Sequence, residues 1–143
     1  MPSRLEALNR WVDDVARLTQ PDRVHWCDGS DAEANALRAQ MLANGTLIEL
    51  NQDTHPGCTL HRSHPSDVAR VEHLTLVCTK HEEDAGPNNH WMDPAAAHEK
   101  IDALFAGCMK GRTMYVIPYC MGPIDSPISR CGVEITDSPY VVA

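Results

Sequence analysis

Arg70 stands out among the residues that could bind an anionic ligand. It lies in the run 67–72, DVARVE, which has the character of a short helix. The planar guanidinium group of arginine donates parallel hydrogen bonds that match a carboxylate or a phosphate. The same spacing places Asp67 three positions earlier, where an ion pair on a helix surface contributes only about 0.2–0.5 kcal/mol. Spacing alone favours that surface pair and leaves an anion site at Arg70 as the alternative.

A second possible anion site is the basic turn at Lys110, Gly111 and Arg112. Two cations and a run of backbone amides between a helix and a strand can hold an anion. A solvated loop explains the same residues, and the pattern alone favours it. The turn is not a phosphate-binding loop of the GxxxxGK[ST] type, because that order of residues is absent.

Cys58, His61 and His64 are spaced three apart, as ligands of a soft cation can be. Pro65 interrupts any helix that would bring the three side chains together, and no nearby acid completes the set. We therefore expect no zinc site here. The six cysteines form no CxxC pair, and we interpret them as reduced thiols of a cytosolic protein. The chain also has no HExxH or GxGxxG motif and no convincing pair of nucleophile and base.

Composition excludes several classes of function. The net charge of −8 makes binding to nucleic acid unfavourable, because an acidic surface repels a phosphate backbone. No apolar run approaches the ~18 residues of a membrane span, and the first residues lack the apolar region of a secretory signal. We expect a cytoplasmic protein of one ordinary domain, since 43% of its residues are hydrophobic.

The elements that must position these residues follow from hydrophobic periodicity and capping signals. A capping box at Ser30 and Glu33 starts one helix, and Asp93 with Pro94 starts another, whose apolar face would be Ala97, Ile101, Leu104 and Phe105. The predicted helices are 5–18, 31–43, 65–72 and 94–106, and the predicted strands are 23–27, 46–50, 59–60, 73–79, 113–118 and 131–136.

This order predicts an α/β fold with a mixed sheet and flanking helices. The strand 113–118, TMYVIP, is almost entirely apolar, so we expect it at the centre of the sheet with both faces buried. Residues 80–91 are charged and polar, and they are predicted to form a loop. A further helix start at Asp137, Ser138 and Pro139 is followed by only four residues. A frayed tail and a chain cut inside a larger protein both explain this ending.

Several runs resemble GTP-dependent phosphoenolpyruvate carboxykinases. They are collinear, cover nearly the whole chain, and comprise QPDRVHWCDGS at 20–30, RSHPSDVARVE at 62–72, NHWMDP at 89–94, GCMKGRTMYVIP at 107–118 and GVEITDSPYVV at 132–142. The resemblance implies that residues 1–143 are part of the amino-terminal, substrate-side domain of a longer enzyme. The carboxy-terminal domain for nucleotide and metal would then be absent from this chain.

The resemblance also implies a reaction. Members of the family convert oxaloacetate and GTP to phosphoenolpyruvate, GDP and carbon dioxide in gluconeogenesis, using Mn²⁺ and a second ion, usually Mg²⁺, with the nucleotide. Arg70 matches the family arginine that binds the oxaloacetate or phosphoenolpyruvate anion. The family's catalytic, metal-binding and nucleotide-binding residues have no counterpart in this chain.

We therefore expect a monomeric enzyme when complete, and no bound metal or turnover from residues 1–143 alone. Two alternatives stay open: a self-standing module that binds small dicarboxylates through Arg70, and a structural remnant without a ligand.

The sequence departs from the family pattern at one loop. Tyr119 and Cys120 stand where relatives usually have Phe and Ser, and Asp125 stands where they usually have Gly. An aspartate at a position that requires positive φ would strain the turn.

Overall fold

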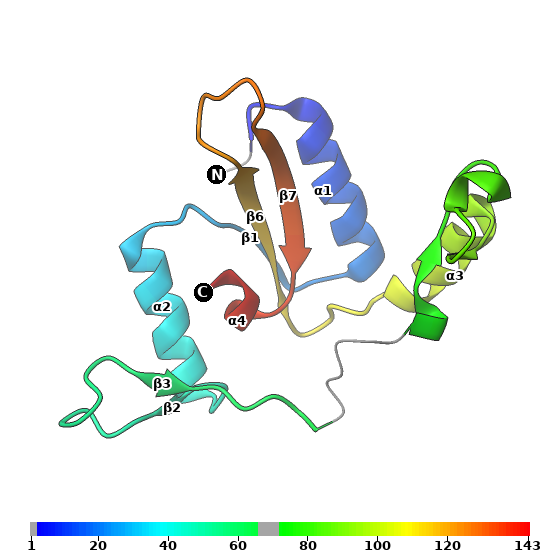
Figure 1. The fold of residues 1–143 in the computed structure, drawn as a ribbon. Coiled ribbons are helices and arrows are strands. Elements are labelled where there is room, and N and C mark those ends of the chain that lie inside the picture. Colours follow the sequence, from blue (N-terminus) through cyan, green and yellow to red (C-terminus); the bar gives the residue numbers. More distant parts are fainter. Residues whose placement is uncertain (1–2, 66–71) are drawn as a thin grey trace.

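The computed structural model describes residues 3–65 and 72–143, and its centre is a three-stranded sheet in the order β1–β6–β7 (Figure 1). β1 runs parallel to β6, with Val24 opposite Met114, and β6 runs antiparallel to β7, with Val116 opposite Ile135. Helices flank this mixed sheet, which confirms the predicted α/β class. The three strands are Arg23–Trp26, Thr113–Met121 and Arg130–Thr136.

Helices cover the sheet on both faces, with α1 on one side and α2 and α4 on the other (Figure 1). Successive side chains of a strand point to opposite faces. Met114 and Val116 therefore pack with Val12 of α1, whereas Tyr115 packs with Met41 of α2. This three-layer core confirms that the strand beginning at Thr113 is central. Met114, Tyr115 and Val116 are buried between the two helical layers, whereas the strand continues past its predicted end with residues 118–121 exposed. The helices are α1 (Glu6–Thr19), α2 (Asp31–Ala43), α3 (Pro94–Phe105) and α4 (Pro139–Val142).

The helix caps follow the sequence signals. The Ser30 side chain accepts from the backbone N–H of Glu33 at 3.1 Å, and Asp93 accepts from Ala95 and Ala96 at 2.9 and 3.0 Å. The capping box at Ser30 is only half formed, because the Glu33 carboxylate turns away from the Ser30 amide and binds elsewhere.

The segment between α2 and β6 consists of short elements and α3. Residues 72–105 form an extension beside the sheet, which we call the α3 arm (Figure 1). No helix in the described ranges has both the length and the apolar character that a membrane span requires. The short elements are β2 (Ile48–Glu49) paired with β3 (Thr59–Leu60), β4 (Leu76–Val77) paired with β5 (His90–Trp91), and 3₁₀ helices at Glu72–Leu74 and Glu82–Ala85.

Three expectations were wrong in this region. The strand predicted at 73–79 is only Leu76–Val77, because a 3₁₀ helix occupies its beginning. The loop predicted at 80–91 contains the β5 strand, which pairs in parallel with β4. In α3 only Ala97 is buried, whereas Ile101, Leu104 and Phe105 are exposed, since no layer covers that face in the described residues.

Two further predictions concern backbone geometry. Asp125 has φ +67°, so this aspartate does adopt the left-handed conformation that the family's glycine would accept without strain. The helix predicted at 65–72 falls mostly on residues 66–71, which lie outside the described ranges.

Candidate functional site

Arg70, the predicted substrate-binding residue, lies outside the described residues. Its role in substrate binding therefore stays a prediction. The described residues instead bring together a cluster that the sequence pattern did not single out.

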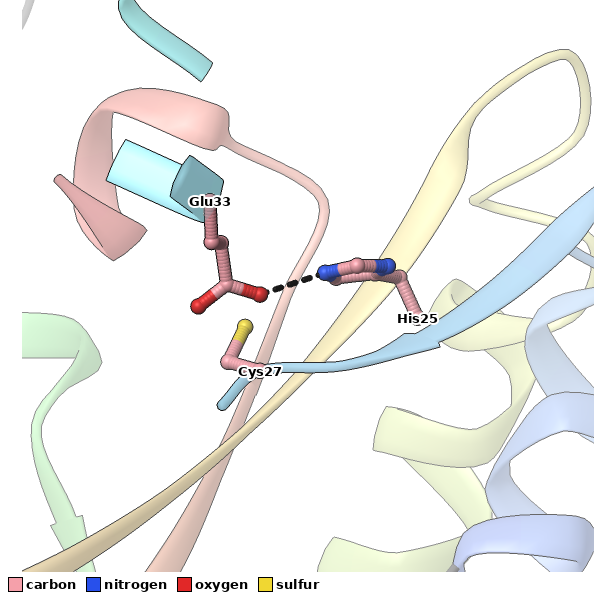
Figure 2. A group of neighbouring side chains, drawn as sticks. All are labelled: His25, Cys27 and Glu33. Atoms are coloured by element: carbon pink, nitrogen blue, oxygen red, sulfur yellow. Dashed lines mark hydrogen bonds and ion pairs between the residues drawn. The ribbon is translucent and has the colours of Figure 1, made fainter. Parts of the chain in front are cut away.

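This cluster consists of His25, Cys27 and Glu33 (Figure 2). One ligand atom from each residue lies within 4.8 Å of the others. His25 lies in β1, and Cys27 is the first residue after that strand. Because side chains two residues apart on a strand point to the same face, both side chains point toward α2. Glu33 comes from the first turn of α2. The turn between β1 and α2 thus folds the three side chains onto one another.

Glu33 is the centre of the cluster. Its Oε1 lies 2.6 Å from His25 Nε2, and its Oε2 accepts backbone N–H bonds from Asp28 at 3.0 Å and Gly29 at 2.9 Å. Burial opposes ionisation of this side chain, which is 10% exposed. The bonds from His25, Gly29 and Asp28 together outweigh burial, and they hold the pKa of Glu33 below its usual value. Glu33 is therefore an ionised carboxylate that closes the turn.

Cys27 is a protonated thiol in this setting. Burial, followed by the charges of Glu33 and Asp28, raises its pKa to about 11. A thiol with that pKa is a poor nucleophile at neutral pH, because the thiolate is the reactive form. The backbone N–H of Cys27 donates to Val116 at 2.9 Å, so the cluster is fixed to the central strand.

The cluster could hold a soft divalent cation only at a cost. Its nitrogen, sulfur and oxygen donors are types that zinc accepts. A cation would have to displace the thiol proton of Cys27 and break the bond between His25 and Glu33. The geometry therefore supports a structural role, in which the cluster fixes the turn that joins β1 to α2. A cavity of about 430 Å³ beside it is lined by Arg23, His25, Glu33, Gln40 and Tyr115, among others.

The sequence carried one signal for this cluster that the interpretation missed. His25 and Cys27 alternate on a predicted strand, and Glu33 sits in the first turn of the next helix. A complete capping box would place the Glu33 carboxylate on the Ser30 amide. This expectation did not include the contact with His25 that the structure shows.

The basic turn at Lys110, Gly111 and Arg112 is already engaged with carboxylates of the chain itself. The Gly111 N–H donates to Asp22 at 3.0 Å, and Arg112 forms an ion pair with Asp137 at 2.7 Å. These contacts use the Gly111 amide and the Arg112 guanidinium group, which are two of the groups that would hold an anion. The structure therefore favours the interpretation as an ordinary loop.

The structure does not gather Cys58, His61 and His64 into a group of close ligand atoms within the described residues. His61 Nδ1 donates to the Thr46 carbonyl at 2.8 Å, and its ring stacks on Tyr140 with centroids 3.9 Å apart. His61 thus joins the β2–β3 region to α4. The absence of zinc at these residues stays a prediction.

Comparison with known proteins places this fold in a family. Residues 10–143 match the family described as "Phosphoenolpyruvate carboxykinase N-terminal domain". The chain is 59% identical over 131 residues to the phosphoenolpyruvate carboxykinase [GTP] of Anaeromyxobacter dehalogenans, which covers 92% of this chain and 22% of that protein. It is 53% identical over 137 residues to the protein of the same name from Chlamydia pneumoniae, covering 96% of this chain and 23% of that protein.

The chain thus spans less than a quarter of the length of these relatives. The match runs through the β1–α2 turn, the central strand β6 and the short helix α4, so it includes every layer of the fold. The chain belongs to the phosphoenolpyruvate carboxykinase family, within its amino-terminal domain.

Proposed function

We propose that this chain forms the amino-terminal part of a GTP-dependent phosphoenolpyruvate carboxykinase. The complete enzyme would convert oxaloacetate and GTP to phosphoenolpyruvate, GDP and carbon dioxide, a step of gluconeogenesis, in the cytoplasm and as a monomer. The observation that supports this proposal is identity above 50% to proteins of that name over more than nine-tenths of the chain.

Arg70 is the residue of this chain that we propose to contact the substrate. Its guanidinium group would hold a carboxylate of oxaloacetate or the phosphate of phosphoenolpyruvate through parallel, charge-assisted hydrogen bonds. Such contacts position the anion and neutralise part of its charge, while the transfer of the phosphoryl group takes place on other residues.

The described residues do not fit the Mn²⁺ and Mg²⁺ ions that the proposed reaction uses. Mn²⁺ and Mg²⁺ prefer oxygen ligands, with imidazole less common. The cluster of His25, Cys27 and Glu33 offers a protonated thiol and a carboxylate whose oxygens already accept three bonds. We therefore assign no metal ligand and no catalytic step to it, and we expect the ions to bind outside residues 1–143.

A chimera tests the role of Arg70. Residues 1–143 would be joined to the remainder of the Anaeromyxobacter dehalogenans enzyme, and its formation of phosphoenolpyruvate would be measured with oxaloacetate, GTP and Mn²⁺. A charge-assisted bond contributes roughly 1.5–3 kcal/mol, so Arg70→Ala should lower kcat/KM for oxaloacetate about ten- to a hundred-fold. Arg70→Lys should also lower kcat/KM clearly, because lysine keeps the charge but lacks the paired parallel donors of the guanidinium group. Binding of GTP should be nearly unchanged in both variants.

Arg10→Ala is the matched control, since Arg10 is an exposed arginine of α1. It should leave both kinetics and thermal stability near those of the parent. Parent kinetics in both Arg70 variants would exclude Arg70 from the substrate site and support the surface pair with Asp67. Residues 1–143 alone should form no phosphoenolpyruvate, and steady turnover by the pure chain would contradict the proposed division of the enzyme.

A further inference from the structure

Cys120 and Cys131 lie directly opposite each other at one end of the β6–β7 pair. The strand register aligns Tyr119 with Gly132, Cys120 with Cys131 and Met121 with Arg130. Figure 1 shows the two strands side by side up to the loop that joins them. Both cysteines are free and exposed. Two thiols therefore face each other across neighbouring strands on an open part of the molecule.

The backbone already has the spacing that a disulfide requires. Residues directly opposite in an antiparallel pair have Cα atoms about 4.5–5.5 Å apart. Disulfide-bonded cysteines have Cα atoms about 4.4–6.8 Å apart. The register of Cys120 and Cys131 is thus compatible with the Cα spacing of a disulfide.

The two thiols already interact. A hydrogen bond to Cys120, followed by the charge that Cys120 carries when it ionises, raises the pKa of Cys131. The thiol of Cys131 thus donates toward Cys120. The raised pKa of Cys131 disfavours its thiolate, which is the reactive form, so Cys131 is assigned the second step of the reaction.

Access to the pair is open. A groove of about 1060 Å³ runs between the beginning of α1 and the loop end of the β6–β7 pair, and both cysteines line it. None of the other four cysteines, all within the described residues, faces a cysteine across a strand. The geometry therefore distinguishes this pair from every other combination of thiols in the chain.

We propose that Cys120 and Cys131 are a thiol modification site that reacts with a small-molecule disulfide, such as oxidised glutathione, to form a cross-strand disulfide.

The reaction proceeds in two exchanges. The Cys120 thiolate attacks one sulfur of glutathione disulfide, the S–S bond breaks, and one glutathione leaves as a thiolate that takes up a proton. Cys131 then loses its proton to solvent and attacks the Cys120 sulfur of the mixed disulfide, which releases the second glutathione. The two protein thiols lose two electrons and two protons, and one small disulfide is reduced to two thiols.

Trypsin offers a clean test, because cleavage after Arg112 and Arg130 places the two cysteines in separate peptides, 113–130 and 131–143. The folded 143-residue protein would be treated with oxidised glutathione, its remaining thiols alkylated, and the digest examined by mass spectrometry without reductant. We expect the two peptides as a linked pair that dithiothreitol separates. We also expect the thermal midpoint to rise by roughly 5–10 °C on oxidation, because the bond closes the loop between the strands.

Variants supply the controls. Cys58→Ser removes another exposed thiol and should leave the linked pair unchanged. Cys120→Ser and Cys131→Ser should abolish the linked pair and the rise of the thermal midpoint, with glutathione retained on the remaining cysteine. A stable mixed disulfide at Cys120 without a linked pair would overturn the proposal. So would linked peptides spread equally over other cysteines, or reaction confined to Cys58 and Cys78.

Discussion

The central strand β6 and the helix α3 both have apolar residues at the spacing of a buried face, but most of those in α3 are exposed. Met114, Tyr115 and Val116 are at most 2% exposed, whereas Leu104 of α3 is 70% exposed and Phe105 is 49% exposed. β6 has a neighbouring strand on each edge and helices over each face, while the exposed face of α3 has no such cover in the described residues. A local pattern of residues thus decides which element forms, whereas burial of that element depends on a partner from elsewhere in the chain.

Truncation of one apolar side chain in each region should have very different effects on stability. Met114→Ala should lower the free energy of unfolding by about 2–5 kcal/mol, because it removes a fully buried side chain and leaves a cavity. Leu104→Ala should change it by no more than about 0.5 kcal/mol, since its side chain is exposed. Urea unfolding followed by circular dichroism measures both. Equal losses would show that the face of α3 is buried in solution.

Removal of the two helix caps should affect different parts of the molecule. Ser30→Ala and Asp93→Ala each remove a side-chain acceptor, with an expected cost of about 1 kcal/mol to the helix concerned. The loss at Ser30 should shift the global unfolding transition, because α2 is part of the core. The loss at Asp93 should instead speed hydrogen exchange of amides in α3 and shift the global transition less. Asp53→Ala, at an exposed residue of the loop between β2 and β3, is the control. Equal global shifts for the two caps would mean that the α3 arm and the sheet unfold together.

The smallest expected effect is a dependence on pH. The pKa of Glu33 is lower in the folded chain than the ordinary value of 4.5, so its ionised form stabilises the fold above that pH. This contribution should be lost as the pH falls through the lowered pKa. Between about pH 6 and about pH 3, Glu33→Gln should therefore lose less thermal stability than the parent.

Glu82→Gln, in the exposed part of the α3 arm, should follow the parent over the same range. If the thermal stability of Glu33→Gln fell as steeply with pH as that of the parent, the bonds to His25, Asp28 and Gly29 would not depend on the charge of Glu33.

Much of the fold could be predicted because its signals are local. Ser30, Asp93 and Pro94 mark helix starts by their own chemistry, and the apolar run from Thr113 marks a buried strand. The exposure of Leu104 could not be predicted, since it depends on what covers α3.

The short parallel pair of β4 and β5 was missed for a related reason. Strands of two residues have no periodicity, and the pair is fixed by contacts such as the Trp91 indole N–H that donates to Thr79 at 3.0 Å.

The candidate site was less predictable than the fold. Arg70 was singled out by resemblance, and its segment lies outside the described residues. The cluster of His25, Cys27 and Glu33 depends on a turn that reverses the chain, and no pattern of residue types specifies how tightly such a turn closes. The alignment of Cys120 with Cys131 likewise depends on strand register, which the loop between them sets.

The parallel pairing of β1 with β6 has a consequence for how the chain folds. Thr19, at the end of α1, contacts Met114 of the central strand, and the two residues are 95 positions apart. During synthesis, α1 and β1 leave the ribosome long before β6. Their apolar residues therefore have no packing partner until β6 has been synthesised. Contacts of such long range slow folding, because the entropy of closing the intervening chain is lost before the contacts form. We therefore expect substitutions at Met114 and Val116 to slow folding strongly.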